Sequence, residues 1–97
     1  SFLNQTEFNM KQTTLQIFED PGHAWARVPR KRLIRLGIAD KVSVYSYQNK
    51  DNVFLEEDCD LPLMVNALKE RGYEVKFKTS HTERESKIRK FNSYQPA

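Results

Sequence analysis

The clearest pattern of apolar and polar residues runs from Val53 to Thr79 and predicts a strand, a helix and a second strand. The apolar run VFL is followed by acidic residues and then by Asp60, a residue type favoured at helix N-caps. A helix over residues 61–71 follows from apolar positions at helical spacing, which are Leu61, Met64, Val65 and Leu68. Gly72 is typical of the position just after a helix. Apolar and charged residues then alternate from Tyr73, as in a strand exposed on one face.

The N-terminal half shows shorter signals of the same kind. Alternation over residues 13–19 predicts a first strand, and Asp20-Pro21-Gly22 predicts a turn in which glycine takes a positive φ. Residues 23–28 read as a second strand that can pair back on the first. Pro29 suits the start of a short helix over residues 30–36, and Gly37 suits its end.

Two further segments complete the pattern. Residues 42–47 and 53–57 predict a hairpin joined by a polar turn over residues 48–52. Thr82 and Glu85 have the spacing of a capping box, which predicts a short helix over residues 83–91 with Ile88 and Phe91 facing inward. A disordered basic tail is the alternative, because the last fifteen residues contain few apolar side chains.

These elements predict an α+β fold, with a small antiparallel or mixed β-sheet and two helices packed on it, a main one over about 61–71 and a short one over about 30–36. The 97 residues suffice for one core. We expect residues 1–12 to be a flexible arm or an expression remnant, 13–80 to form a single domain, and 81–97 to be a basic C-terminal segment. No apolar run approaches the roughly 20 residues that span a bilayer. With one cysteine and no recognisable secretion signal, we expect a cytoplasmic protein.

The net charge of +3 is modest, but the basic residues are clustered. Such clusters attract phosphate backbones or acidic proteins, although solvated surface is the plainer interpretation. The candidates for contact with a nucleic acid or an acidic partner are Arg27, Arg30, Lys31, Arg32, Arg35, Lys87, Arg89 and Lys90.

Aromatic and histidine side chains form a second set of candidates. Tyr45 and Tyr47 fall on one face of the expected strand, where exposed rings can stack on bases or anchor a protein interface. The alternative is that they cover the second side of a small sheet. The candidate partner or ligand contacts are His23, Trp25, Tyr45, Tyr47 and His81.

The remaining chemistry argues against an enzyme. Glu56, Glu57, Asp58 and Asp60 can supply oxygen ligands or an acid–base pair, but carboxylates before a helix are also favoured by its dipole, and we prefer that explanation. Cys59 lies among these acids, which disfavour the thiolate. Neither histidine has a metal-ligand or triad spacing, and no phosphate-binding glycine loop occurs. We therefore predict no catalytic residues, no metal and no cofactor.

Residues 25–58 resemble the core of swapped-hairpin, AbrB-like bacterial DNA-binding domains. The matching features are Val28-Pro29 at a helix start, Leu36-Gly37-Ile38 at its end, Asp40-Lys41-Val42, and the strand Val53-Phe54-Leu55. The resemblance covers about a third of the chain and implies DNA binding by an interleaved dimer.

A longer set of segments is similar to small proteins of phages and other mobile elements, a resemblance that implies no activity. These segments are FEDPGHAW, VPR, LGIADKVSVYSYQ and VFLEEDCD.

Three hypotheses about function follow. The first is a non-enzymatic protein of a mobile element that binds and modulates or inhibits a host protein, such as a defence or transcription factor, and we favour it. The second is a nucleic-acid-binding regulator, and the third is a small-ligand binder or enzyme using the region of His23, Trp25 and His81. The oligomeric state stays open, with a homodimer among the alternatives.

Overall fold

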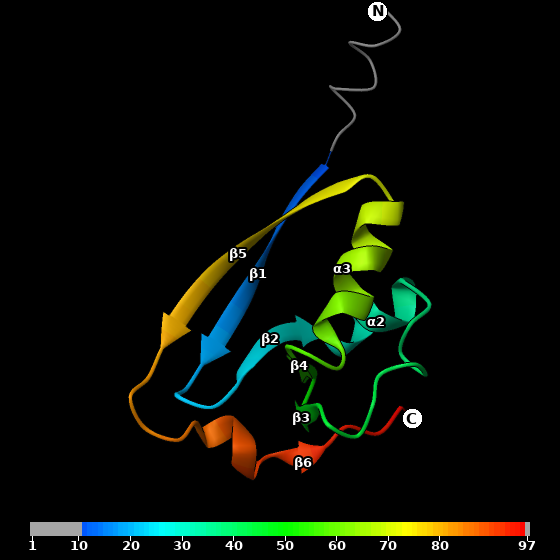
Figure 1. Cartoon of the computed structure of the whole chain (residues 1–97). Helices are drawn as coiled ribbons and strands as arrows, with labels where there is room; N and C mark the ends of the chain where they lie inside the picture. Colours follow the sequence, from blue (N-terminus) through cyan, green and yellow to red (C-terminus); the bar gives the residue numbers. More distant parts are fainter. Residues whose placement is uncertain (1–10, 97) are drawn as a thin grey trace, which may run out of the picture.

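The computed structural model describes residues 11–96 and contains a six-stranded mixed sheet with two α-helices, so the expected α+β fold is confirmed (Figure 1). In chain order the elements are β1 (Lys11–Glu19), β2 (Ala24–Pro29), α2 (Arg30–Arg35), β3 (Tyr47–Asn49), β4 (Asn52–Glu56), α3 (Leu61–Glu70), β5 (Tyr73–His81), the 3-10 helix η1 (Lys87–Lys90) and β6 (Asn92–Ser93). The expected arm at residues 1–10 lies outside the described residues, whereas residues 11 and 12 begin β1. No helix within 11–96 has the length and apolar character needed to cross a bilayer.

The strand order is β5-β1-β2-β4-β3-β6. The β1–β2 and β3–β4 pairs are antiparallel hairpins between sequence neighbours. β5 instead returns after α3 to pair in parallel with β1 along nine residues, from Lys11 opposite Tyr73 to Glu19 opposite His81. These two strands form the long ribbon at the left of Figure 1.

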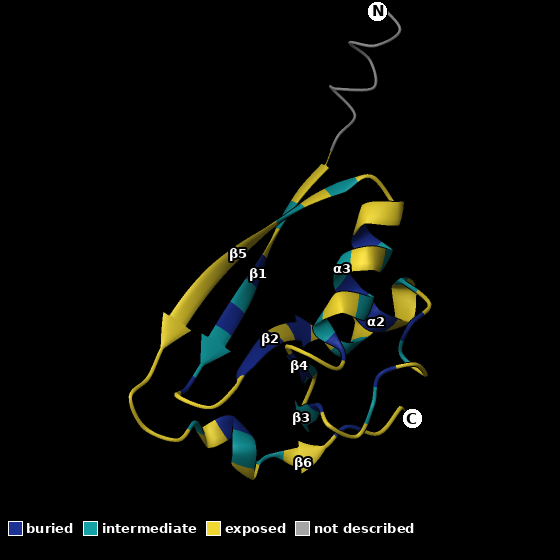
Figure 2. Cartoon of the chain, viewed as in Figure 1, coloured by how far each residue is buried: buried dark blue, intermediate teal, exposed yellow. Residues whose placement is uncertain are grey.

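Strand alternation divides the buried side chains between the two faces of the sheet. One face carries Leu15, Ile17 and Leu55, which pack with Leu33 of α2 and with Met64 and Leu68 of α3 in the larger core cluster. The other face carries a smaller cluster of Trp25, Phe54 and Ile88, the last from η1. Figure 2 shows this burial concentrated in β2 and β4, while β5 is largely exposed.

The predicted strand–helix–strand unit is confirmed as β4, α3 and β5, and Gly72 has the expected positive φ of 86°. Asp60 lies at the N-cap position of α3, as predicted, but its side chain has a different role. Its carboxylate makes no cap hydrogen bond and is almost fully buried, where it accepts hydrogen bonds from the Ser43 hydroxyl (2.7 Å), the Ser43 backbone N–H (3.0 Å) and the Ser46 hydroxyl (2.5 Å). Two distant hydroxyls therefore compete successfully with the local helix N–H groups for this acceptor.

The predicted β1–β2 hairpin and the short helix α2 are present, and Gly37 after α2 has a φ of 74°. Gly22 in the hairpin turn does not take the expected positive φ. The turn is closed by the Asp20 carboxylate, which accepts the N–H groups of Gly22 and His23. A Cβ on Gly22 would lie 2.9 Å from Nη2 of Arg89, so any larger residue there would displace the end of the Arg89 side chain.

The predicted strand over residues 42–47 is wrong. Val42 is buried in the core, and Ser46 donates its N–H to Ser43 in a turn, so the segment bends to bring both hydroxyls to Asp60. Only residues 47–49 form β3, and the hairpin turn is the two-residue Lys50-Asp51, with Lys50 at a φ of 56°.

The helix predicted over residues 83–91 is replaced by an extended approach and the single 3-10 turn η1. The Ser86 hydroxyl, rather than Thr82, caps this turn by accepting the Ile88 N–H. Ile88 does face inward, and the chain continues to Tyr94, which is 1 % exposed. Residues 82–96, the C-terminal segment, are thus packed against the sheet rather than forming a disordered tail.

Candidate binding site

A buried ion pair fixes the C-terminal segment to the β1–β2 turn. The Asp20 carboxylate accepts hydrogen bonds from Nε (2.7 Å) and Nη2 (2.9 Å) of Arg89, and from the Ser86 N–H at 2.9 Å. The Arg89 guanidinium holds the pKa of Asp20 well below its usual range, and the carboxylate in turn raises the pKa of Arg89. Both groups therefore stay charged across the physiological range.

The same guanidinium lies over the indole of Trp25, 5.4 Å from the ring centroid. Trp25 also meets Tyr47 edge-on, with centroids 6.3 Å apart, and approaches the His23 ring at 6.0 Å. These residues come from β2, β3 and the turn before β2, so the sheet itself sets their spacing. The buried Trp25 Nε1–H finds no acceptor among the described residues.

A hollow of about 350 Å³ opens beside this aromatic group. We call it the aromatic pocket, and it is lined by His23, Trp25, Tyr45, Tyr47, Glu56, Asp58, Cys59 and Arg89. Four of the five predicted partner contacts therefore lie around one hollow, although Tyr45 reaches it from a turn rather than from a strand. The ring of Tyr45 is 68 % exposed at its rim.

The charge of the aromatic pocket is negative. Glu56 and Asp58 contribute two carboxylates, and the one guanidinium is already paired with Asp20. Glu56 is buried, and both of its carboxylate oxygens accept the Asp58 backbone N–H, at 2.8 and 3.0 Å. Desolvation and the neighbouring acids Asp58 and Glu56 raise the pKa of Glu57 beside the pocket. Such a site favours a cation.

The pocket lacks a recognisable catalytic group. Burial, followed by the charges of Glu56, Asp60 and Asp58, raises the pKa of the Cys59 thiol, which weakens it as a nucleophile. Within residues 11–96, no group of three or more histidine, cysteine or acidic side chains is arranged to hold a metal ion.

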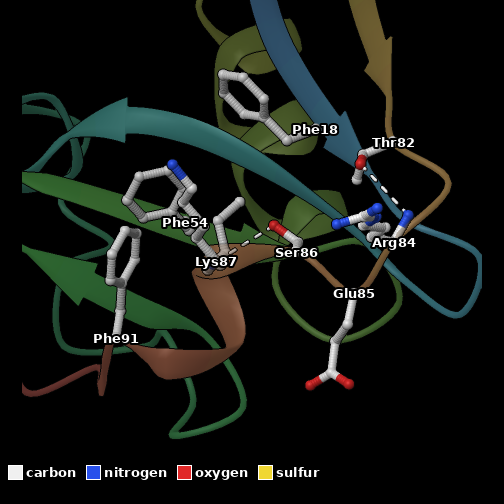
Figure 3. Close-up of a pocket in the computed structure, with 9 residues that line it drawn as sticks. Phe18, Phe54, Thr82, Arg84, Glu85, Ser86, Lys87 and Phe91 are labelled. Carbon is white, nitrogen blue, oxygen red and sulfur yellow. Dashed lines mark hydrogen bonds between the residues drawn. The ribbon is translucent and has the colours of Figure 1, made fainter.

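A second hollow on the same face of the sheet, of about 420 Å³, is apolar. Its apolar walls are formed by Phe18, Phe54, Ile88 and Phe91, and its polar rim by Thr82 and residues 84–87 of the C-terminal segment (Figure 3). We call it the phenylalanine pocket. Ile88 and Arg89 are adjacent in η1, so the two pockets adjoin the same turn of the chain.

The predicted basic residues do not form one surface. Arg30 donates to the Gln95 and Pro96 carbonyls and to Gln48, and its guanidinium lies over Tyr94. Arg89 is paired with Asp20, and Arg27 lies over the Phe18 ring at 5.2 Å. Lys31 is exposed on α2, and Lys87 and Lys90 are exposed on η1.

Two of the predicted arginines do converge with cations that the sequence did not single out. A hollow of about 250 Å³ is lined by Lys11, Arg32, Arg35 and Arg71 together with Leu36, Leu68 and Tyr73. We call it the basic hollow. Arg32 and Lys11 both approach the Tyr73 ring, at 5.8 and 5.4 Å. Among the described residues no acid lines it, and none of its cations forms an ion pair.

His81 lies apart from the aromatic pocket. Its ring contacts Glu19 at 3.0 Å and Glu83 at 3.3 Å at the end of the β1–β5 ribbon. Conversely, Glu56 and Asp58 belong to the pocket, although the sequence favoured a purely structural role for them. Their sequence position would have indicated this, because Glu56 lies on the strand that pairs with the strand of Trp25 and Asp58 follows it.

Comparison with known proteins found no matching family model, curated protein or solved structure.

Proposed function

We propose that this chain is a non-enzymatic binding protein that recognises a partner protein through a cationic side chain, lysine or arginine, held in the aromatic pocket. The observation that carries the proposal is the combination of aromatic rings with two carboxylates around one hollow. Aromatic faces attract cations, and adjacent carboxylates supply the counter-charge. The similarity to proteins of mobile elements suggests a host protein as the partner, whose activity the chain modulates or inhibits.

The phenylalanine pocket adds a second contact of a different kind. An apolar side chain near the cationic one in the partner would bury surface against Phe18, Phe54 and Phe91. Interfaces of this type obtain most of their affinity from a few well-packed anchors. A basic residue near an apolar residue is therefore the feature that we expect in the partner.

The direct test titrates the ¹⁵N-labelled chain with N-acetyl-arginine amide and N-acetyl-lysine amide, with N-acetyl-leucine amide as the neutral probe. The cationic probes are expected to shift resonances of residues in the aromatic pocket, more weakly at high salt. Two variants at exposed positions, Tyr45→Ala and Asp58→Asn, should each weaken binding about 3-fold to 30-fold, the range of a cation–π or exposed ionic contact. Equal binding of the leucine probe, or no shift in the pocket, would overturn the proposal.

Each of these two variants has a matched control outside the pocket. Val44 is 67 % exposed beside Tyr45 but does not line the pocket, so Val44→Ala should leave binding unchanged. Asp51→Asn removes an exposed acid outside the pocket and should also have no effect. The same four variants then serve in affinity capture from host lysate, where the captured protein should be lost with Tyr45→Ala and Asp58→Asn only.

A second candidate function is nucleic-acid binding, and the basic hollow favours it. Four cations without a facing acid among the described residues provide a site for a phosphate group. If this surface is used, Arg35→Ala should reduce oligonucleotide binding and its salt dependence, because one phosphate contact is lost. Lys69→Ala, an exposed charge on α3 outside the hollow, is the matched control. Nuclease-resistant capture of a protein separates the first function from this one.

A further inference from the structure

The strand β5 is an unusually long and open edge of the sheet. It spans nine residues at one end of the strand order, and in the part of the chain described it pairs only with β1. No other element lies along its outer side in Figure 1, and Figure 2 shows most of it exposed. Phe77 within it is 52 % exposed. Long edges of this kind pair readily with other strands unless something blocks them.

The hydrogen bonds at both ends of the ribbon fix which backbone groups are free. Lys11 donates its N–H to the Gly72 carbonyl at 3.3 Å, and Thr82 donates its N–H to the Glu19 carbonyl at 2.9 Å. In a parallel pair these bonds recur at every second residue. The even-numbered residues of β5 therefore bond to β1. The residues that direct N–H and C=O to the open edge are Tyr73, Val75, Phe77, Thr79 and His81.

We infer that this edge binds a second copy of the chain, with the two β5 strands antiparallel about a two-fold axis at Val75. Two edges can bond only where outward-facing residues meet, so odd-numbered residues must face odd-numbered residues. An axis at Val75 satisfies this condition and sets Tyr73 opposite the partner's Phe77. The exposed Phe77 ring of each copy then packs beside Tyr73 of the other copy.

The charges on the strand select this register. With the axis at Val75, Glu74 faces the partner's Lys76, and symmetry makes the pair twice. With the axis at Phe77, Lys76 would face the partner's Lys78, which is a repulsive pair. With the axis at Lys76, two lysines would face each other directly. Of these three registers, only the one with its axis at Val75 places Lys76 opposite a negative charge.

The other edge of the sheet explains why the contact should be symmetric. β6 has two residues, so it offers little backbone for a head-to-tail contact with β5 of another copy. Pairing β5 with itself uses one surface on both copies and closes the assembly as a dimer. The aromatic pocket contains no residue of β5, so its binding and the dimer can be tested separately.

The test combines sedimentation with disulfide trapping in a Cys59→Ser background, which removes the chain's only cysteine. Val75→Cys places both thiols at the axis, where hydrogen-bonded residues lie about 5.5 Å apart between Cα atoms, within disulfide range. It should give a covalent dimer on mild oxidation. Phe77→Cys, on the same face, should not, because the two copies lie about 14 Å apart along the strands.

Charge reversal provides the second measurement. Glu74 is exposed and has only long contacts with Gln12 (3.5 Å) and Lys76 (4.0 Å), so substituting it should not unfold the chain. Glu74→Lys should raise the dimer dissociation constant at least severalfold, and the swap Glu74→Lys with Lys76→Glu should restore it. A monomeric wild type at high micromolar concentration would overturn the inference, as would crosslinking through Phe77→Cys instead of Val75→Cys.

Discussion

At the scale of single residues, the Asp20–Arg89 pair shows how one carboxylate organises two distant segments. Asp20 accepts N–H groups from its own turn and from Ser86, while Arg89 bridges Asp20 and Trp25. The Asp20 side chain is completely shielded from solvent and that of Arg89 is 28 % exposed. The wall of the aromatic pocket thus depends on an ion pair whose carboxylate is shielded from solvent.

This pair predicts how stability depends on acidity. The pKa of Asp20 is depressed in the folded chain, so its contribution to the free energy of unfolding is complete above the unfolded value near 3.9 and is lost as the pH falls below it. Asp20→Asn should lower the free energy of unfolding at neutral pH. It should also make that free energy fall less steeply on acidification, by the amount that corresponds to about one bound proton. Urea unfolding at several pH values measures this slope. Asp51→Asn, at an exposed site, should keep the wild-type slope, and an unchanged slope in Asp20→Asn would contradict the assignment.

Single residues were also where local reasoning from the sequence failed most clearly. Asp60 has the sequence context of a helix cap, but its carboxylate binds Ser43 and Ser46, which no local pattern reveals. Gly22 has the context of a residue with positive φ, but its φ is not positive and its Cα lies close to the end of the Arg89 side chain. In both cases the deciding partner lies far away in the sequence.

At the scale of elements, α3 was predicted with nearly its observed bounds because its apolar spacing and Gly72 act locally. The conformation of residues 42–46 was not predicted correctly. The β-branched and aromatic residues of this segment are typical of a strand, but its two serines donate hydrogen bonds to Asp60 and the chain bends to reach it. Of the candidate site, the aromatic set was largely predictable because Trp25 and Tyr47 lie on β2 and β3, which both pair with β4. The basic set was not, because adjacent arginines on a short helix point to different surroundings.

The packing of α3 gives the prediction at this scale. Leu68 is fully buried between α3 and the sheet, so Leu68→Ala should lower the free energy of unfolding by about 2–5 kcal/mol. Asn66 is exposed on the same helix, and Asn66→Ala should change stability by less than about 0.5 kcal/mol. Urea unfolding with a common slope compares the two. A near-neutral Leu68→Ala would show that α3 is not docked as described.

At the scale of the whole molecule, contacts between distant segments decide the architecture. The parallel β1–β5 pair and the C-terminal segment join regions more than sixty residues apart, as in the Arg30 bond to Gln95. Tyr94 links the C-terminal segment to three earlier positions in the chain. Its hydroxyl donates to the Ala39 carbonyl, its N–H donates to the Ser46 carbonyl at 2.8 Å, and Arg30 lies over its ring at 5.0 Å. Such pairings leave no local trace in a sequence, which is why the tail was read as a short helix or as disordered.

Tyr94 therefore predicts how strongly the C-terminal segment supports the rest of the fold. Tyr94→Ala empties a buried aromatic site and should cost about 3–5 kcal/mol, as for other large-to-small changes of core aromatics. Tyr94→Phe keeps the ring and loses one hydrogen bond, so it should cost about 1 kcal/mol. Tyr45→Ala, at an exposed tyrosine, should be close to neutral. Hydrogen exchange should then show faster opening of β3 and β6 in Tyr94→Ala than in Tyr94→Phe, because Tyr94 directly follows β6 and bonds to Ser46 just before β3. Equal free energies of unfolding for all three variants would show that the packing of the C-terminal segment does not stabilise the rest of the fold.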